Sequence, residues 1–362
     1  MKSLHLQLTL RSPALLAGSA PADSLLETLQ FIPGNNVRGI LAERYLGSRG
    51  TADSIFHQIF VSGRARFGFA FAEGSQVIPL SARSCKYDGG FQNDGDHGML
   101  DLLLPADQPV SCRHPKCGLA IDSCRGFWDP SKHRRVQVKT RTITRAAIDA
   151  RRGSSRPGRH YLQRVLEEGQ KFSCSIEVPD NLETHLDSLC TRAFWASLGR
   201  GVSRGQGWVE VEKRQVSGPE WGPAKDRFKL FSEARGKPVL AVTLLTDGLF
   251  KDNYLRDVTA PTLEDLTRLQ IVPSEWKETF VRAFMDVRAV FGFDGEPVYL
   301  PRVPRLAVTA GSVFLFEARD DVVEPTIPEG NGVGWIGDLN REGYGLAALW
   351  HPFHLMPEGN LS

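Results

Sequence analysis

A glycine-rich run between residues 198 and 212, LGRGVSRGQGWVEVE, constrains the fold of this chain more than any other stretch. Four glycines and two arginines fall within nine residues: Gly199, Arg200, Gly201, Arg204, Gly205 and Gly207. Glycine tolerates positive φ and has no Cβ, so such a loop lets backbone N–H groups approach a phosphate, and the arginines add charge and forked donors. The run leads into a strand-like WVEVE and lacks a Gly-Lys-Ser/Thr ending, which excludes a Rossmann or Walker loop. A flexible glycine hairpin is the alternative interpretation.

A second glycine run, GVGWIGDLNREGYGLAAL at residues 332–349, repeats this pattern about 138 residues later. Arg341 precedes the Gly-x-Gly that begins at Gly343, as Arg204 precedes the first one, and an apolar run follows both. A motif that occurs twice predicts two related domains. A chain of 362 residues is also long enough for two hydrophobic cores.

The composition excludes several classes of protein. Apolar residues make up 41% of the chain, charged residues make up 24%, and the net charge is +2, so any nucleic-acid binding must come from local patches. No apolar run approaches the length of a membrane span, and the N-terminus alternates polar and apolar residues where a signal peptide would have an apolar core. Six cysteines are too few for a disulfide framework. We therefore expect a cytoplasmic protein with no membrane contact.

A turn and a helix are predicted in FIPGNNVRGILAERYL, residues 31–46, after a first strand over residues 4–10. Pro33-Gly34 is the turn, and Asn35 or Asn36 is the candidate N-cap. The free N–H groups of the helix N-terminus, with Asn36 and Arg38 beside them, form a candidate anion site. A plain capped helix accounts for the same residues.

Four of the six cysteines lie within 40 residues, at Cys85, Cys112, Cys117 and Cys124. Four thiolates can make a closed structural zinc site, which would hold together a loop with little core of its own. His97 or His114 is a candidate to replace one sulfur, and ordinary buried or free thiols are the alternative. Asp94, Asp96 and Asp101 are candidate metal ligands nearby, although solvated turn residues explain them better.

The most basic stretch runs from residue 132 to residue 164 and holds eleven Lys and Arg against one acid, Asp149. Alternation over residues 136–142 predicts a strand, and the 150s are expected to form a loop. A basic segment of this kind is typical of RNA binding, and a solvated basic face is the alternative. The candidate RNA-binding residues here are Lys139, Arg141, Arg145, Arg151 and Arg152.

The order of these motifs resembles the RAMP superfamily, the repeat-associated proteins of CRISPR–Cas systems. Pro33-Gly34-Asn35-Asn36-Val37-Arg38-Gly39 stands where that family has Pro-Gly-Ser-Ser-Leu-Arg/Lys-Gly, and the first glycine run matches its GxxxxRGxG loop. Phe67-Gly68, IDARR at residues 148–152, and GRHYL at residues 158–162 before EGQKF at residues 168–172 also match. The resemblance implies an α+β chain of two ferredoxin-like (RRM-like) RAMP domains, with a zinc-binding insertion in the first.

The domain boundaries expected on this basis are residues 1–222 and 235–362. The first domain would contain the cysteine insertion at about residues 82–130 and a basic, thumb-like segment at about residues 132–164; the second would be a degenerate copy without the IPG helix signature. Residues 213–235 are expected to form a linker. Helices are expected over residues 182–196, 263–269 and 275–287, and strands over residues 239–245, 303–309 and 312–317.

Two RAMP domains in one chain resemble the subunit of type III-D CRISPR effector complexes that holds the 5′ handle of the guide RNA. The resemblance implies guide RNA, target RNA, a large polymerase-like subunit and backbone RAMP subunits as partners. Arg38, the basic stretch and both glycine loops would bind RNA, while Phe67, Trp208 and Tyr344 would either stack on bases or belong to the core.

Catalysis is the main alternative function. In related backbone subunits an aspartate before the IPG helix cleaves target RNA, and Asp23 occupies roughly that place, although the surrounding SAPADSLL lacks the family pattern. The nine histidines form no recognisable catalytic pair. We therefore expect a non-enzymatic RNA-binding subunit, with a RAMP ribonuclease and a purely architectural protein as rivals.

Overall fold

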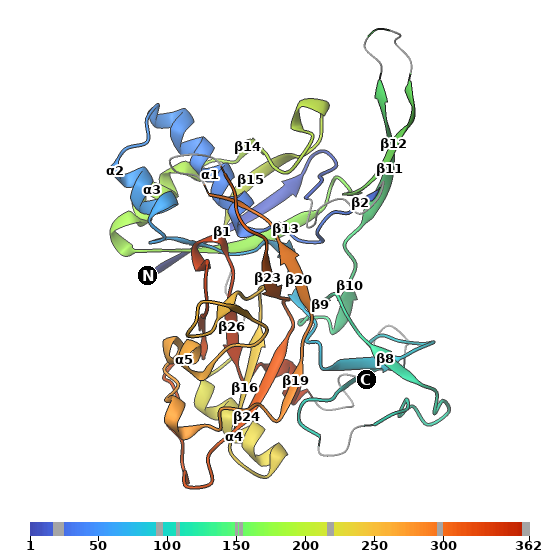
Figure 1. Ribbon diagram of the computed structural model, residues 1–362, viewed down its shortest axis with the longest axis vertical. Coiled ribbons are helices and arrows are strands. Elements are labelled where there is room, and N and C mark those ends of the chain that lie inside the picture. Colours follow the sequence, from blue (N-terminus) through green and yellow to red (C-terminus); the bar gives the residue numbers. More distant parts are fainter. Residues whose placement is uncertain are drawn as a thin grey trace.

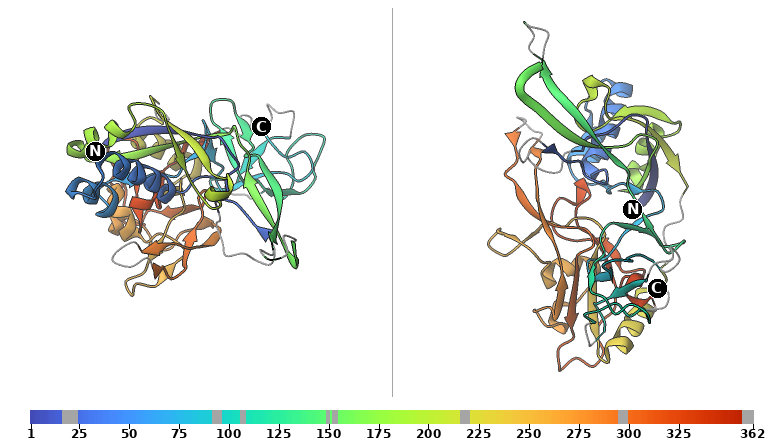
Figure 2. Two further views of the ribbon diagram at one scale, coloured as in Figure 1. Left: turned by 90° about the horizontal axis from the view of Figure 1, so that it is seen from above. Right: turned by 90° about the vertical axis from the view of Figure 1, so that its right-hand side faces the viewer.

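Two antiparallel sheets form the two halves of the molecule; a long hairpin projects from the first half, and a small lobe lies beside the second (Figures 1 and 2). The computed structural model describes residues 1–16, 25–91, 97–105, 109–148, 151, 155–215, 221–294 and 300–356. Among the helices in these ranges, none combines the length and the apolar composition that crossing a membrane requires.

The sheet of the first half has the strand order β14-β15-β1-β13-β3, and β4 also pairs with β13. Its strands are β1 (Lys2–Leu10), β3 (Arg66–Phe67), β4 (Phe71–Ala72), β13 (Lys171–Val178), β14 (Phe194–Ser197) and β15 (Trp208–Arg214). Neighbouring strands are antiparallel, with Leu6 opposite Cys174 on one side of β1 and Lys213 on the other. The order β15-β1-β13-β3, with a helix in the first and third connections, is that of a β-α-β-β-α-β unit.

Helices α1 (Gly34–Arg49) and α3 (Asp180–Leu189) supply these connections, and the short α2 (Ser54–Phe56) continues into a π-helical turn over His57–Val61. Helix α1 buries Val37, Ile40, Leu41 and Tyr45, which recur at helical spacing, in the core beneath the sheet. It begins at Gly34 and has no side-chain cap, so the predicted Asn cap is wrong: both asparagines lie within the first turn.

The sheet of the second half repeats the strand order of the first: β25-β26-β16-β24-β19 corresponds to β14-β15-β1-β13-β3. Its strands are β16 (Val239–Leu244), β19 (Arg282–Phe284), β24 (Val313–Glu317), β25 (Val333–Trp335) and β26 (Leu346–Leu349). Helix α4 (Ala224–Arg235) precedes β16, and α5 (Leu263–Leu266) lies between β16 and β19. The connection from β24 to β25 has no helix in the described part of the chain, so the second half is the simpler copy.

Three expected elements differ from the structure. Much of the expected linker is helix α4, which buries Ala224 and Phe231 in the second core. The helix expected over residues 275–287 is absent, because β19 pairs instead with the apolar strand β24, and β20 (Val287–Val290) follows. The helix expected over residues 182–196 ends at Leu189, and its last residues form β14. The strands expected over residues 4–10, 239–245, 303–309 and 312–317 and the helix over residues 263–269 are confirmed.

The lobe is built from two three-stranded sheets, β7-β6-β8 and β10-β9-β5. Its strands are β5 (Gln76–Val77), β6 (Ala82–Cys85), β7 (Met99–Asp101), β8 (Ile121–Ser123), β9 (Phe127–Asp129) and β10 (Arg134–Val136). Only a small core of its own supports it, where Trp128 packs against Phe353 from the C-terminal segment. Leu103 and Leu104 leave the lobe to join the core of the second half. The insertion thus ties the two halves together.

The basic stretch forms the hairpin of β11 (Thr140–Ile148) and β12 (Ser155–Leu166), which extends away from both sheets (Figure 1). The strand expected over residues 136–142 is interrupted, since β10 ends at Val136 and β11 begins at Thr140, and residues 155–159 of the expected loop belong to β12. The short strand β2 (Leu25–Leu26) runs parallel to β12. Short ribbons complete the second half: β17 (Phe250–Lys251), β18 (Asp257–Val258), β21 (Phe293–Asp294), β22 (Leu300–Pro301) and β23 (Arg305–Val308), which pairs with β20.

Candidate nucleic-acid interface and metal centre

The first glycine loop joins β14 to β15 and contains a 3₁₀ turn over Val202–Arg204. Its four glycines have φ between 76° and 81°, in the left-handed region that favours glycine. A Cβ on Gly207 would lie 2.0 Å from the carbonyl oxygen of Leu198, whose N–H donates to the Gly207 carbonyl at 2.9 Å. The loop is therefore a closely packed turn that requires glycine, and the flexible-hairpin interpretation is wrong.

The second glycine loop has the same construction between β25 and β26. Gly345 has a φ of 82°, a Cβ there would lie 1.9 Å from the Ile336 carbonyl oxygen, and the Ile336 N–H donates to Gly345 at 2.8 Å. Leu339 adopts a left-handed φ of 54° where the first loop has Gly201. Matching close approaches and matching places in the two sheets show that the two runs are equivalent.

This equivalence changes which residues correspond. When Gly207 is matched with Gly345, Arg200 corresponds to Asp338 and Arg204 corresponds to Glu342. Arg341, which was predicted as the counterpart of Arg204, lies one residue before the actual counterpart, Glu342. The second loop thus carries acids where the first carries arginines.

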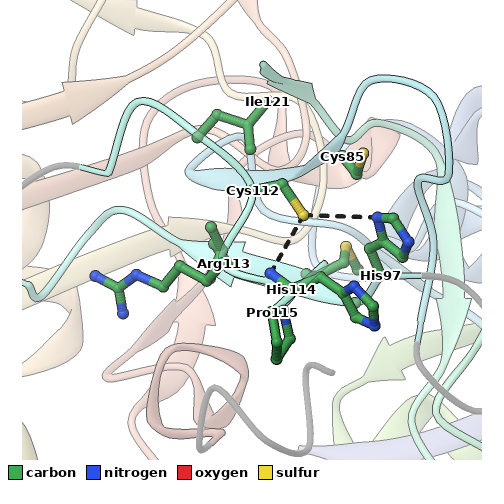
Figure 3. A pocket seen from close by; sticks show the side chains of 10 residues that line it. Cys85, His97, Cys112, Arg113, His114, Pro115 and Ile121 are labelled. Carbon is green, nitrogen blue, oxygen red and sulfur yellow. Dashed lines mark hydrogen bonds between the residues drawn. The ribbon is translucent and has the colours of Figure 1, made fainter. Parts of the chain in front are cut away.

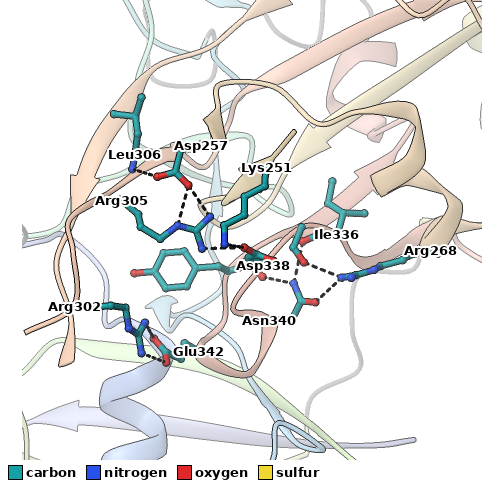
Figure 4. Close-up of polar contacts among 12 residues, drawn as sticks. Lys251, Asp257, Arg268, Arg302, Arg305, Leu306, Ile336, Asp338, Asn340 and Glu342 are labelled. Atoms are coloured by element: carbon teal, nitrogen blue, oxygen red, sulfur yellow. Dashed lines mark hydrogen bonds and ion pairs between the residues drawn. The ribbon is translucent and has the colours of Figure 1, made fainter. Parts of the chain in front are cut away.

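The acids of the second loop are used inside the molecule (Figure 4). Glu342 is 6% exposed and binds Arg302 through two hydrogen bonds of 3.0 and 3.2 Å, while its carboxylate lies 3.6 Å from Arg38. Asp338 binds Arg305 at 3.0 Å, and Arg305 also binds Asp257. The contact with Arg38 holds the loop against the first half, and the other pairs fix it within the second half.

Four predicted RNA-binding residues lie at or next to this contact between the halves. Burial lowers the pKa of Arg38, and its Nη1 donates to the Phe60 carbonyl at 3.4 Å. Arg341 donates to the Val61 carbonyl at 2.9 Å, and a Cβ on Gly343 would lie 2.4 Å from the Phe67 carbonyl oxygen. Asn36 lies in the first turn of α1. Their predicted role in RNA binding is untested, and Arg38 and Arg341 contact protein groups here.

The first loop faces solvent instead. Arg200 and Arg204 are both exposed, and Arg204 donates to the hydroxyl of Tyr161 on β12 at 3.1 Å. Beneath them the buried Gln206 donates to Gln163 of the same strand at 3.3 Å. The loop and the base of the basic hairpin therefore form one continuous surface.

The hairpin presents a row of cations along β11 and the residue before it. Lys139, Arg141 and Arg145 alternate with other residues and so share one face of the strand. Arg141 pairs with Glu168 at 3.0 Å, and Arg164 of β12 pairs with Glu27 at 3.1 Å, but both pairs are exposed and weak. Lys139 and Arg145 form no ion pair with the residues that the structure describes. Arg151 is exposed near the tip, and Arg152 lies outside the described ranges.

Three of the four cysteines predicted as metal ligands form a cluster with a histidine. Cys85, His97, Cys112 and Cys117 place their ligand atoms within 4.8 Å of one another, and Figure 3 shows the first three of them. Cys124 is not among them, because it is buried in the core of the lobe with Met99 and Trp128. His97 takes the fourth position, as the sequence allowed.

The spacing of these atoms fits a tetrahedral zinc ion. Cys85 Sγ lies 3.7 Å from Cys117 Sγ, and Cys112 Sγ lies 3.7 Å from His97 Nδ1. A zinc–sulfur bond of about 2.3 Å gives tetrahedral edges of about 3.8 Å, so the cluster has the size of a Cys₃His site. The other ring nitrogen of His97 lies 3.8 Å from the Asp88 carboxylate, where metal-binding histidines usually have an acceptor.

The surroundings of the cluster favour thiolates and a fixed geometry. Backbone N–H groups of Asp88 and Tyr87 that donate to the sulfur help to lower the pKa of Cys85 to about 7. The backbone N–H of His114 lies 3.5 Å from Cys112 Sγ, and the His114 ring stacks on His97 with centroids 4.1 Å apart (Figure 3). By contrast, burial in the core of the first half raises the pKa values of Cys174 and Cys190 to about 12.

Asp101, considered as a metal ligand or a solvated turn residue, is neither. It is buried in β7, and its Oδ2 lies 2.7 Å from Nδ1 of the buried His354, whose Nε2 lies 3.0 Å from Thr243 Oγ1. This chain of polar contacts, which no sequence motif indicates, connects the lobe and the C-terminal segment to β16. Asp94 and Asp96, like Asp23, lie outside the described residues. Of the aromatic residues, Phe67 and Tyr344 are buried, whereas Trp208 is exposed.

Comparisons with known proteins bear on the fold. No protein-family model and no curated protein matches this chain. Similar solved structures include a chain of the Type III-B Cmr-beta complex bound to cognate target RNA and AMPPnP, with a TM-score of 0.45, 11% identity and 86% of each chain covered.

Pyrococcus furiosus Cmr4 (Cas7) has a TM-score of 0.28 at 12% identity, with 59% of this chain and 100% of that chain covered. A chain of the Type IV-B CRISPR complex has a TM-score of 0.26 at 10% identity, with 60% of this chain and 94% of that chain covered.

Proposed function

We propose that this chain is a non-catalytic RNA-binding subunit of a type III CRISPR ribonucleoprotein, of the type III-D kind, that holds the 5′ repeat-derived handle of the guide RNA. The ordered IPG, glycine-loop and basic-segment motifs support the family, and two sheets of identical strand order support two related ferredoxin-like domains. Guide RNA, target RNA, a large polymerase-like subunit and backbone RAMP subunits are the partners that follow from this assignment.

The observation that carries the proposal is the projecting hairpin and its junction with the first glycine loop. Residues 139–166 contain eight Lys and Arg and a single acid in a chain whose net charge is only +2. The like charges of the hairpin repel one another and so do not stabilise the fold, whereas they neutralise phosphates well. Arg204 joins the arm to the body of the protein through Tyr161.

A salt titration tests the proposal. We expect the purified protein to bind short single-stranded RNA with an affinity that falls steeply with salt. The double substitution Lys139→Ala/Arg145→Ala removes two cations that have no described ion-pair partner, so the slope of log K against log salt should become shallower by about 1.4, at about 0.7 per phosphate contact. Lys225→Ala/Lys229→Ala removes two exposed cations from α4 and is the matched control. Equal slopes for all three proteins would count against the hairpin as the RNA site.

A ribonuclease acting through Asp23 is the second candidate. Its test is incubation of repeat RNA and of complementary target RNA with the protein in Mg²⁺ or in EDTA. We expect both RNAs to remain intact. Specific cleavage that Asp23→Ala abolishes would replace the non-catalytic assignment.

We also propose a structural zinc ion held by Cys85, His97, Cys112 and Cys117. A metal at this position would cross-link β6 to the loop before β7 and to the loop between β7 and β8. The lobe that it would stabilise has only a small core of its own. All four ligand positions would come from protein, which is typical of a structural site.

A further inference from the structure

A groove of about 630 Å³ lies between helices α1 and α3 and strand β14, at the outer edge of the first sheet. Its size is within the range of small-ligand sites. Helix α1 contributes residues from Ile40 to Arg49, α3 contributes its last turn, and β14 contributes Phe194 to Ser197, with Trp208 beside them. The helix predicted over residues 31–46 supplies one wall, but no residue of the glycine loops, the basic stretch or the cysteine cluster lines this groove.

Two tryptophans at the groove are unusually exposed. Trp195 is 61% exposed and Trp208 is 43% exposed, whereas Trp128, Trp276 and Trp350 are almost fully buried. In the pairing of β14 with β15, Trp195 lies opposite Glu210 and Trp208 lies opposite Ser197, so the two rings occupy diagonal positions on one face of the ribbon. Tryptophan rings left in water beside each other are typical of a binding site.

The charged residues of the groove are mostly cationic. Arg44, Arg49 and His185 line it, against a single acid, Glu43. The Arg44 guanidinium is fixed 4.3 Å from the centre of the Phe194 ring, and its Nε donates to the Leu189 carbonyl at 3.1 Å. Neither arginine forms an ion pair with a carboxylate among the residues described. This charge favours an anionic ligand.

The groove also continues the surface assigned to RNA. Strand β14 runs from Trp195 directly into the loop that carries Arg200 and Arg204, and Trp208 follows the same loop. Arg204 contacts Tyr161 at the base of the hairpin. A strand of RNA that leaves the hairpin can therefore pass the arginines and reach the tryptophans, and the acid opposite Trp195, Glu210, is paired with Arg11.

We infer that this groove is a stacking site for unpaired nucleobases of the bound RNA. Trp195 and Trp208 stack on the bases, while Arg44 and Arg49 contact the phosphates. The inference rests on the proposed RNA-binding function and adds a site at the far end of the same surface. A protein strand that pairs with the free edge of β14 would use the same place, but it would gain nothing from two unpaired arginines.

The test is RNA affinity and intrinsic fluorescence in Trp195→Ala and Trp208→Ala, measured with a short unstructured oligoribonucleotide. Base–aromatic stacking sets the expected loss at about 5- to 150-fold in affinity for each substitution. RNA should quench the fluorescence of the wild-type protein, and each substitution should reduce the quenching. Tyr254→Ala, which removes an 80% exposed aromatic ring from the second half, is the control and should bind like the wild type. Thermal unfolding verifies that each variant is folded.

The possible failures are distinguishable. If the wild-type protein binds RNA, and Lys139→Ala/Arg145→Ala weakens binding, but both tryptophan variants bind like the wild type, the stacking site is refuted and the proposed function stands. If the tryptophan variants keep their RNA affinity but lose a co-purifying subunit, the groove binds a protein strand and the inference is equally refuted. If the wild-type protein does not bind RNA, the proposed function falls and the stacking site falls with it.

Discussion

At the scale of single residues, two equivalent loops carry opposite charges for different purposes. Arg200 and Arg204 of the first loop are exposed, whereas Asp338 and Glu342 at the matching positions are paired with arginines of the protein. The glycines around them are shared because the turn needs them. The same backbone thus presents exposed cations in one half and makes an internal contact in the other.

Gly207→Ala should destabilise the protein strongly, and Gly205→Ala should do so only mildly. Both glycines have a φ of 78°, but only at Gly207 would a Cβ meet backbone, the Leu198 carbonyl oxygen at 2.0 Å, whereas nothing lies within 4 Å at Gly205. Backbone strain alone costs about 1 kcal/mol, and we expect the Gly207 variant to lose at least twice that in chemical denaturation. Equal losses for the two variants would show that the close approach is unimportant.

His351 should make stability depend on pH. Complete burial lowers its pKa well below 6.5, and its Nδ1 accepts the Phe353 N–H at 3.2 Å. The unfolded chain therefore takes up a proton below about pH 6.5 that the folded protein does not, so the free energy of unfolding falls as the pH falls through that value, by up to about 1.4 kcal/mol per pH unit.

His351→Asn keeps an acceptor for the Phe353 N–H but cannot titrate, so its unfolding free energy should vary less between pH 6.5 and pH 5 than that of the wild type. His160→Asn, at an exposed position, should follow the wild type. Parallel pH profiles for all three proteins would rule out the buried imidazole as the cause.

At the scale of elements, the lobe and the hairpin differ in how they are held. The hairpin needs only its own ladder between β11 and β12 and the short strand β2. The lobe has a small core, shares Phe353 and two leucines with the rest of the molecule, and gathers Cys85, His97, Cys112 and Cys117 at one point. A metal there would replace the apolar burial that the lobe lacks.

Elemental analysis of the purified protein should give about one zinc per chain. Cys117→Ser should lose the metal and lower the thermal stability of the lobe, whereas Cys124→Ser should retain the metal, because Cys124 lies in the apolar core. Loss of zinc from Cys124→Ser with retention in His97→Ala would restore the four-cysteine site that the sequence first predicted.

The sequence predicted the elements whose signal is local. The alternating residues of β1, the helical spacing of Val37, Ile40, Leu41 and Tyr45, and the repeated glycines all specify their own structure. Sequence patterns did not predict the elements that depend on partners distant in the chain. Residues 282–284, for example, form a strand because they pair with β24. His97 and Cys124 could not be told apart as ligands, because their positions depend on how β6, β7 and β8 pair. No sequence pattern indicated the groove at Trp195, because the sequence alone does not distinguish an exposed tryptophan from a buried one.

At the scale of the whole molecule, the second glycine loop joins the halves. Glu342, 6% exposed, lies against Arg38 of α1 and Arg302 of the second half, and Tyr344 packs edge-on against Phe69 of the first. Leu103 and Leu104 also join the halves, because they extend from the lobe and pack in the core of the second half. The helix terminus that the sequence marked as an anion site is thus next to a carboxylate of the same chain.

Glu342→Gln should therefore destabilise the whole molecule, because it leaves two partly buried guanidinium groups without their shared carboxylate. We expect a loss of about 3 kcal/mol in chemical denaturation. Glu264→Gln, at an exposed position on α5, should cause little change. If the two variants unfold alike, the ion pairs at this contact contribute nothing to the joining of the halves.

The proposal that this chain holds guide RNA within a CRISPR ribonucleoprotein can be tested by purifying the tagged protein from its own cells and sequencing the RNA that remains bound, beside the Lys139→Ala/Arg145→Ala variant. We expect short RNAs that share a repeat-derived 5′ end, together with other effector subunits, and a reduced yield of RNA with the variant. Recovery of the protein with no such RNA and no partner subunits would contradict it.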